Sequence, residues 1–497
     1  MIVALDGTVL TVVQPALQRD LDASFAQVQW TSTGYLIAVA SLLVFAGRLG
    51  DRYGHRRLFA VGTLGFAAAS AGVGLASGIG AVIAWRVAQG VFGALLQPAT
   101  LGMLRAAFPP DRLGTPIALR TSSIGLAAAA GPVLGAALAT QLGWRSVFFI
   151  SVVPALAIGV LALVVRGGVP AGRAAGPAGR DPGPAGRAAG PAPRLDLPGA
   201  GLLAVALACL VHTLVGVPES GWRATTVAGL VVACAAGAAF VRHERRTAGP
   251  LVPARLLRSP AVAPALGILV AASAATFGAL FVATYFLQEV LELDPLHGAL
   301  RGVPLAVTMI VGAPLSAVLL RRAGPRRTIT GAMAVLAAGV LALSQLDRTS
   351  GPLTTGVAFT LVGAGFGTVM VAATAVVVRH APESDAGVAG GLQQTAMNVG
   401  PALGIALATT LLTTLTSRTP TAGPGASHWS AEPFLAAMPT VLMSLAAVAA
   451  VGALVATRLP GLGGPGPGLV VQGAPAGPAK EGLPAPAEAP PGEATHG

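Results

Sequence analysis

Charged residues are scarce in this chain of 497 residues: only 10% are Asp, Glu, Lys or Arg, against about 25% in an average soluble domain. Hydrophobic residues make up 54%, and the mean hydropathy is +0.74. This composition excludes an ordinary soluble protein and indicates one that lies in a lipid bilayer. The net charge of +12 does not indicate a nucleic-acid partner, because the basic residues lie between apolar runs and form no patch on a soluble domain.

Cysteine is nearly absent as well. Cys209 and Cys234 each fall within an apolar run, where a thiol behaves as a small hydrophobic side chain. They indicate neither a disulfide framework nor a metal site. The sequence also lacks a His/Cys cluster, a nucleophile motif and a phosphate-binding loop. We therefore expect a protein that is not an enzyme and that holds no metal and no cofactor.

What the chain has in abundance is apolar runs of about 20 residues, the length that spans a bilayer. One such run opens the chain. The others lie near 33–49, 58–79, 81–104, 117–141, 146–165, 197–216, 224–241, 262–288, 299–320, 328–346, 352–378, 387–415 and 434–456. The sequence thus predicts an all-α membrane protein with fourteen spans.

The basic residues predict how these spans are oriented. If the chain starts in the cytoplasm, 23 of the 31 Lys and Arg residues lie in cytoplasmic segments and six lie outside. Cytoplasmic loops carry an excess of Lys and Arg in membrane proteins. We therefore predict a multi-pass protein of the plasma membrane with both termini in the cytoplasm.

Two stretches have the composition of disordered chain. The segment 166–196 is rich in Pro and Gly and carries an Arg every seven residues between Arg166 and Arg194. Pro and Gly exclude a helix there, so the spacing does not indicate a coiled coil. Its arginines either contact anionic lipid or belong to a solvated tether. The tail 459–497 has the same character, and both stretches are predicted to be cytoplasmic.

The sequence also repeats itself. GPVLGAALA at 131–139 returns as GPALGIALA at 400–408, and GHRR at 54–57 returns as GPRR at 324–327. The two offsets, 269 and 270 residues, agree. The repeat predicts an N-terminal six-helix bundle over 1–165, two inserted helices over 197–241 and a C-terminal six-helix bundle over 262–456. Such duplication is typical of secondary transporters, whose substrate site lies between the halves near the middle of the membrane.

Charged side chains inside the spans are few. Asp6 and Arg86 lie well inside, whereas Arg120 and His212 lie nearer the margins. In the repeat, Thr276 of the second half corresponds to Asp6 of the first. The carboxylate is therefore not a feature that both halves need for their fold. Because an isolated ion in a bilayer is costly, such residues are usually paired and functional. We predict that Arg86 pairs with Asp6.

Four segments in order resemble the major facilitator superfamily, in its fourteen-span drug/proton antiporter branch (EmrB/QacA-like). They are LDGTVLTVVQP at 5–15, GRLGDRYGHRRL at 47–58, RVAQGVFGA at 86–94 and GLAAAAGPVLGAAL at 125–138. The resemblance covers about 1–457. It implies a secondary transporter that exports small hydrophobic or cationic organic molecules by alternating access. The proton gradient would supply the energy, and Asp6 would load and release the proton beside Arg86.

The resemblance also assigns roles to two further groups of residues. The loop between the second and third spans is a conformational latch in this family, which places that role on Gly47, Asp51, Arg52, Gly54, Arg56 and Arg57. We expect Asp51 and the arginines to form a charge network that breaks when the halves rock, although the arginines could instead only fix topology. The motif that marks proton-coupled exporters falls on Gly125, Gly131, Pro132 and Gly135.

The substrate itself is not specified by the sequence. Pockets of this kind have apolar walls and few polar contacts. The candidate pocket residues are Trp30, Tyr35, Gln97, Phe277, Tyr285, Gln394 and Asn398. The expected partners are a small-molecule substrate, protons and the lipid bilayer, and we expect a monomer. An exporter or facilitator of one specific metabolite is the alternative transporter; a membrane sensor or scaffold without transport activity is the alternative from another class.

The start of the chain carries one more expectation. Five residues precede Asp6 and rise only about 7.5 Å as a helix, whereas a residue at mid-depth lies about 15 Å from the membrane surface. The sequence therefore predicts about ten or more apolar residues upstream of Met1 in the native chain.

Overall fold

The computed structural model describes residues 2–109, 112–164, 195–247, 249–293, 295–416 and 431–460. The predicted linker 166–196 and tail 459–497 fall outside these residues except at their edges. All regular elements in the described part of the chain are helical. A helix satisfies its own backbone hydrogen bonds, which a segment surrounded by lipid must do. Eleven of the described helices are long and apolar enough to cross a bilayer.

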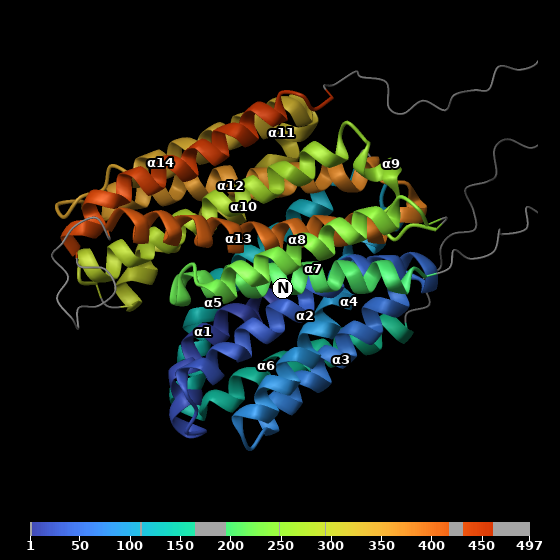
Figure 1. Ribbon diagram of the computed structural model, residues 1–497, viewed down its shortest axis with the longest axis horizontal. Helices are drawn as coiled ribbons and strands as arrows, with labels where there is room; N and C mark the ends of the chain where they lie inside the picture. The colour runs from blue at the N-terminus through green and yellow to red at the C-terminus, as the bar shows by residue number, and fades with distance from the viewer. Residues whose placement is uncertain are drawn as a thin grey trace, which may run out of the picture. The chain divides into compact units, whose positions relative to one another are not determined.

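The first six long helices form one packed group (Figure 1). They are α1 (Ile2–Asp20), α2 (Phe25–Tyr53), α3 (His55–Leu75), α4 (Ile79–Ala107), α5 (Gly114–Leu142) and α6 (Trp144–Val164). α4 packs between α2 and α3, α6 packs on α3, and α1 packs on α5. α2 begins well before the predicted span at residue 33, because Ser24 and Gln27 form a capping box that satisfies backbone N–H groups of its first turn.

A second group forms the larger hydrophobic core of the chain. Its helices are α10 (Val262–Tyr285), α11 (Pro295–Leu343), α12 (Pro352–His380), α13 (Ala386–Thr416) and α14 (Ala431–Ala456). A π-helical turn, η2 (Phe286–Val290), extends α10. α13 packs on α10, α11 packs on α12, and α14 packs on both α10 and α11. A 3-10 turn, η3 (Glu383–Asp385), leads into α13.

The inserted helices are α7 (Leu197–Ser220) and α8 (Ala224–Glu244), followed by the short α9 (Ala254–Leu257). α7 packs on α8, on α2 of the first group and on α13 of the second, and runs beside both in Figure 1. Asp196 fixes the pair at one end, since its carboxylate accepts from the backbone N–H of Gly199 and lies 2.8 Å from His243 Nε2. α7 therefore joins the two halves.

Two elements differ in extent from the sequence prediction. The spans expected at 299–320 and 328–346 form the single element α11, which is interrupted by a non-helical residue, Gly324, with φ 76°. The corresponding turn of the first half, between α2 and α3, is made by Gly54 with φ 94°. Glycine adopts positive φ without the steric penalty of a side chain. The sequence repeat GHRR/GPRR thus corresponds to one kind of turn used twice.

The second sequence repeat corresponds to one kind of helix packing used twice. Gly135 of α5 lies against Val9 of α1, where an added methyl group would press on the valine side chain. Gly404 of α13 lies against the backbone of Ala274 in α10. Small residues let helix backbones approach closely. α5 and α13 are therefore counterparts, each packed on the helix that opens its half.

Candidate functional site

The ion pair predicted from the sequence is present. Arg86 of α4 donates from Nη1 to Oδ2 of Asp6 on α1 at 2.6 Å. The two side chains are only 1% and 3% exposed. Burying a charge without a partner costs several kcal/mol, so each of these residues makes the burial of the other tolerable.

Side chains that sequence reasoning did not single out complete the site. Gln89, one turn after Arg86 on α4, donates to Asp6 Oδ1 at 2.9 Å and to Ser70 Oγ at 2.7 Å, and its amide oxygen accepts from Arg86. Arg86 Nε donates to the carbonyl of Thr31 at 3.1 Å. The spacing of Arg86 and Gln89 in an apolar run was a signal for this pair, because residues three apart share a helix face.

Tyr35, which we predicted to line a substrate pocket, lies at the ion-pair site. Its ring centre lies 4.4 Å from the guanidinium carbon of Arg86, a cation–π arrangement. Both carboxylate oxygens of Asp6 are thus hydrogen-bonded, and the guanidinium is held by an anion, a carbonyl and a ring. A proton arriving on Asp6 would remove the negative charge that balances Arg86, so protonation and the arrangement of this cluster are physically linked.

The Asp51 side chain of α2 binds the N-terminal end of α13, a helix of the other half. Its Oδ1 and Oδ2 accept from the backbone N–H groups of Gly387 at 2.7 Å and Val388 at 3.1 Å, in the first turn of α13. These N–H groups have no partner within their own helix, and the helix dipole favours a negative charge there. We call this end of the molecule, where α2 turns into α3, the latch end.

A second carboxylate at the latch end makes the reciprocal contact. Asp385, just before α13, lies 3.2 Å from Arg48 Nη1 of α2 and accepts from Arg255 Nε of α9 at 2.9 Å. Arg48 also donates to the carbonyl of Pro250 at 3.3 Å. Each half therefore offers one carboxylate to the other, and the segment after α8 joins the same network.

Two of the arginines expected around Asp51, Arg56 and Arg57, lie on α3 beyond the turn at Gly54. Arg56 donates to the carbonyls of Ala162 and Leu163, which end α6. Arg52 lies over the ring of Tyr53, and Arg57 is exposed. His55 is an ionisable neighbour of Asp51, with its Nε2 3.3 Å from Oδ1. Asp51 itself faces the first turn of α13.

The glycines of the latch segment have distinct geometric reasons. Gly47 of α2 lies directly against Gly387 of α13, and a methyl group on either would overlap the carbonyl oxygen of the other. Gly54 supplies the positive φ of the turn. In the exporter motif, Gly125 faces Ile310 and Met309 of α11 while Gly135 faces α1. Gly131 is buried in α5. The side chain of Pro132 lies outside the described residues.

The remaining pocket candidates do not lie together at one site. Trp30 stacks on His212 of α7 with ring centres 5.5 Å apart. Phe277 and Tyr285 pack within the second group, on Phe366 and Phe434 respectively. Gln97 is partly buried on α4. Only Gln394 and Asn398 are neighbours: one turn apart on α13, they are joined by a hydrogen bond from Asn398 Nδ2 to the carbonyl of Gln394.

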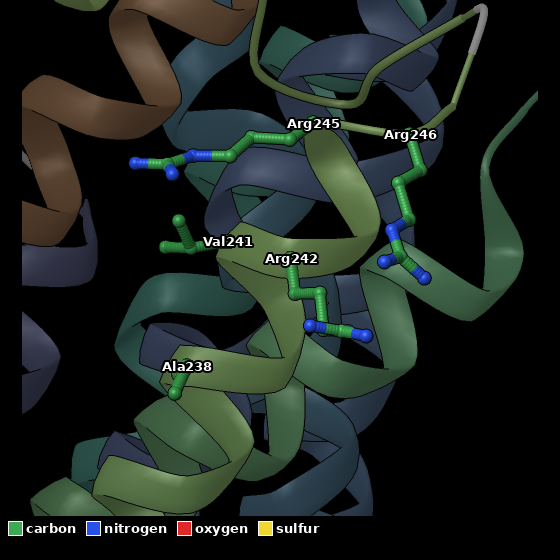
Figure 2. Close-up of a pocket in the computed structure, with 6 residues that line it drawn as sticks. Ala238, Val241, Arg242, Arg245 and Arg246 are labelled. Carbon is green, nitrogen blue, oxygen red and sulfur yellow. The ribbon is translucent and has the colours of Figure 1, made fainter.

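A surface hollow of about 540 Å³ lies apart from these residues, at the end of α8 (Figure 2). Three arginines, Arg242, Arg245 and Arg246, line it with Gly237, Ala238 and Val241. Figure 2 shows Arg242 and Arg246 pointing to one side of the helix and Arg245 to the other. The backbone that follows these arginines accepts from Arg48, so this basic segment belongs to the latch end.

The charge of Asp51 should stabilise the state in which the latch end is closed. We expect Asp51→Asn to weaken that state by about 1–3 kcal/mol, because a carboxylate that accepts two backbone hydrogen bonds at a helix start is lost. Spin labels at the exposed Phe108→Cys and Arg326→Cys, with Cys209 and Cys234 replaced, would report the distance between the halves. The variant should show a larger share of long distances, and an unchanged distribution would contradict the latch.

Comparisons with known proteins agree with this architecture. The profile of the Major Facilitator Superfamily matches residues 1–405. The tetracenomycin C resistance and export protein of Streptomyces glaucescens is 41% identical over 408 residues, 82% of this chain and 73% of that protein. The puromycin resistance protein of Streptomyces alboniger is 34% identical, over 84% of this chain and 80% of its own.

More distant proteins extend the comparison. The multidrug resistance protein Stp of Mycobacterium tuberculosis is 28% identical over 84% of this chain and 74% of its own. The crystal structure of the human organic anion transporter MFSD10 superposes with a TM-score of 0.59, covering 92% of this chain and 97% of that one; at 14% identity, this likeness shows the fold alone. The chain belongs to the major facilitator superfamily, a family of membrane transporters rather than enzymes.

Proposed function

We propose that this protein is a proton-coupled exporter of small, largely apolar organic molecules of the antibiotic type. The observation that supports coupling is the buried Asp6–Arg86 pair, with both carboxylate oxygens hydrogen-bonded. Ionisable pairs inside a membrane mark ion and proton pathways. The direction and substrate type rest on relatives named as resistance and export proteins at up to 41% identity.

The proposed mechanism alternates access between two sides of the membrane. At the latch end the halves are held together by Asp51 on α13, by Arg48 with Asp385, and by the contact of Gly47 with Gly387. We assign this end to the cytoplasm, so the structure corresponds to a state closed on that side. A proton that reaches Asp6 neutralises the carboxylate and weakens its hold on Arg86. The rearranged cluster then favours rocking of the halves, and deprotonation on the cytoplasmic side restores the pair.

We also propose the fourteen-span topology of the EmrB/QacA-like branch. Gly324 divides α11 into two helices, each of spanning length. α1 and α5 are 19 and 29 residues long and pack among the other spans. Counting these with the remaining long helices supports fourteen spans, with both termini in the cytoplasm of a plasma-membrane protein. One chain carries both halves, so we propose a monomer driven by the proton gradient without a cofactor.

A transport screen tests this function. The protein would be expressed in a bacterial host that lacks its own drug pumps and challenged with a panel of apolar antibiotics. We expect reduced accumulation of several compounds, and restored accumulation when an uncoupler removes the proton gradient. Reduced accumulation that the uncoupler leaves unchanged would contradict proton coupling. Export of a single compound would favour a specific metabolite exporter, and no change with any compound would favour a sensor or scaffold.

A further inference from the structure

Arg120 is a second cation within a membrane helix. It lies on α5, about 9 Å along the helix from its start at the latch end, and it is partly buried. Its Nη2 donates to Oε1 of Gln394 on α13 at 3.2 Å. Within the described ranges this is the hydrogen bond that the guanidinium makes, and none of their carboxylates pairs with it. Arg120 therefore differs from Arg86, whose charge Asp6 balances.

The acidic groups that could have balanced Arg120 are engaged by other partners. Asp6 pairs with Arg86, Asp51 accepts from the start of α13 and faces His55, and Asp385 holds Arg48 and Arg255. Keeping a lone cation in a membrane span costs several kcal/mol on insertion scales. A site that retains such a charge without an internal partner is suited to an anion that arrives from outside the chain.

Arg120 lies at a contact between the two halves. α5 and α13 are the counterparts of the two halves, and the hydrogen bond from Arg120 to Gln394 crosses between them. Gln394 lies about 12 Å along α13 from its start, so the pair lies deeper than the contacts of the latch. Buried apolar residues of four helices, α4, α5, α11 and α12, pack together next to this part of α5, among them Leu101, Ile117 and Ala313. The arrangement combines a charged group, the neutral amide of Gln394 and apolar neighbours.

We propose that Arg120 and Gln394 form an anion subsite that takes the carboxylate or ionised phenol of an otherwise apolar substrate. A guanidinium can bind such a group through two parallel hydrogen bonds, and the amide of Gln394 can donate a third. This inference rests on the proposed function, which it deepens by naming the substrate class. It favours organic anions over the cations that the sequence alone allowed.

Three fluorescent probes of one shape test the subsite: an anthracene carboxylate, the corresponding methanol and the corresponding methylamine. Binding to the purified full-length protein in zwitterionic nanodiscs at neutral pH would be followed by fluorescence anisotropy. We expect the carboxylate to bind most tightly. Arg120→Gln should weaken carboxylate binding roughly 10- to 100-fold, the usual contribution of a charged hydrogen-bond partner. The affinity for the methanol probe should stay unchanged.

Two further variants distinguish loss of the subsite from misfolding of the protein. Arg120→Lys keeps the charge and should retain part of the preference for the carboxylate. Gln394→Glu keeps Arg120 but supplies an internal anion beside it, so it should abolish the preference without removing any cation. Arg301→Gln is the matched control, because Arg301 lies on α11 and donates to Thr355 within the second group; it should bind all three probes as the parent does.

The outcomes separate the subsite from the proposed function. Equal binding of the three probes by the parent, no binding of the carboxylate, or a preference that survives both Arg120→Gln and Gln394→Glu would overturn the subsite. The proposed function is tested separately, by measuring uptake of the probes into inside-out vesicles under a proton gradient. A parent that binds the carboxylate selectively but accumulates no probe would contradict export while leaving the anion subsite standing.

Discussion

Asp6→Asn is expected to abolish proton-driven export. Asn cannot exchange a proton in the physiological range, and in the described helices Asp6 is the carboxylate that pairs with a buried cation deep within the membrane. The substitution also leaves Arg86 buried without an anion, which costs about 3–5 kcal/mol when one partner of a buried pair is removed. Uptake into inside-out vesicles under an imposed pH gradient should fall to the level of vesicles without the protein.

A control on the same helix separates loss of coupling from loss of charge. Asp20→Asn makes the same chemical change at the other end of α1, where the carboxylate is 47% exposed and pairs with Arg145. An exposed ion pair contributes about 0–1 kcal/mol, so this variant should transport at close to the parental rate.

A second measurement tests whether the Asp6→Asn protein is intact. Exchange of labelled for unlabelled substrate across vesicles without a gradient requires a folded transporter but no net proton movement. We expect this exchange to persist in Asp6→Asn while gradient-driven uptake is lost. Gradient-driven uptake at the parental rate in Asp6→Asn would show that the coupling site is elsewhere.

Gly387→Val is expected to stop the transport cycle at the latch. A side chain at this position would overlap the carbonyl oxygen of Gly47, and backbone atoms cannot move aside as a flexible side chain could. α2 and α13 must then separate, and the hydrogen bonds from Gly387 and Val388 to Asp51 are lost with the contact. We expect the closed latch to be disfavoured and export to fall by at least roughly tenfold, since interior overpacking costs about 1–3 kcal/mol.

The companion variant is Gly331→Ala. Gly331 lies on the part of α11 that follows Gly324, and a methyl group there meets nothing within 4 Å. Alanine also favours a helix over glycine by about 1 kcal/mol. This variant should transport normally. In Gly387→Val, the labels at 108 and 326 should report separated halves, and binding of the anthracene carboxylate should persist. Normal export by Gly387→Val would mean that transport does not require this contact.

The sequence predicted the elements of the fold because hydropathy and loop charge are local properties. Every predicted span corresponds to a helix or, at α11, to one part of a helix broken at a glycine. The two internal repeats appear as paired turns and paired helix contacts. The pairing of Asp6 with Arg86 was also predictable, because two opposite charges far inside apolar runs have few other ways to be satisfied.

What the sequence could not supply is the set of contacts between segments far apart in the chain. It placed Asp51 among neighbouring arginines, whereas Asp51 lies on backbone N–H groups more than 330 residues away. The residue types do not show which backbone N–H groups a distant side chain will contact. The sequence also grouped aromatic and amide residues into one candidate pocket, whereas in the structure they make separate contacts in both halves.

The sequence by itself therefore determined the membrane class, the long apolar helices, the duplication and the Asp6–Arg86 ion pair, because each follows from residue chemistry along the chain. The tertiary structure decided which groups share a charge and which do not. Gln89 and Ser70 join Asp6, Asp385 holds Arg48, and Arg120 meets an amide rather than a carboxylate. Only the tertiary structure shows that Arg120 of α5 meets Gln394 of α13, since the balance of charges depends on distances in space.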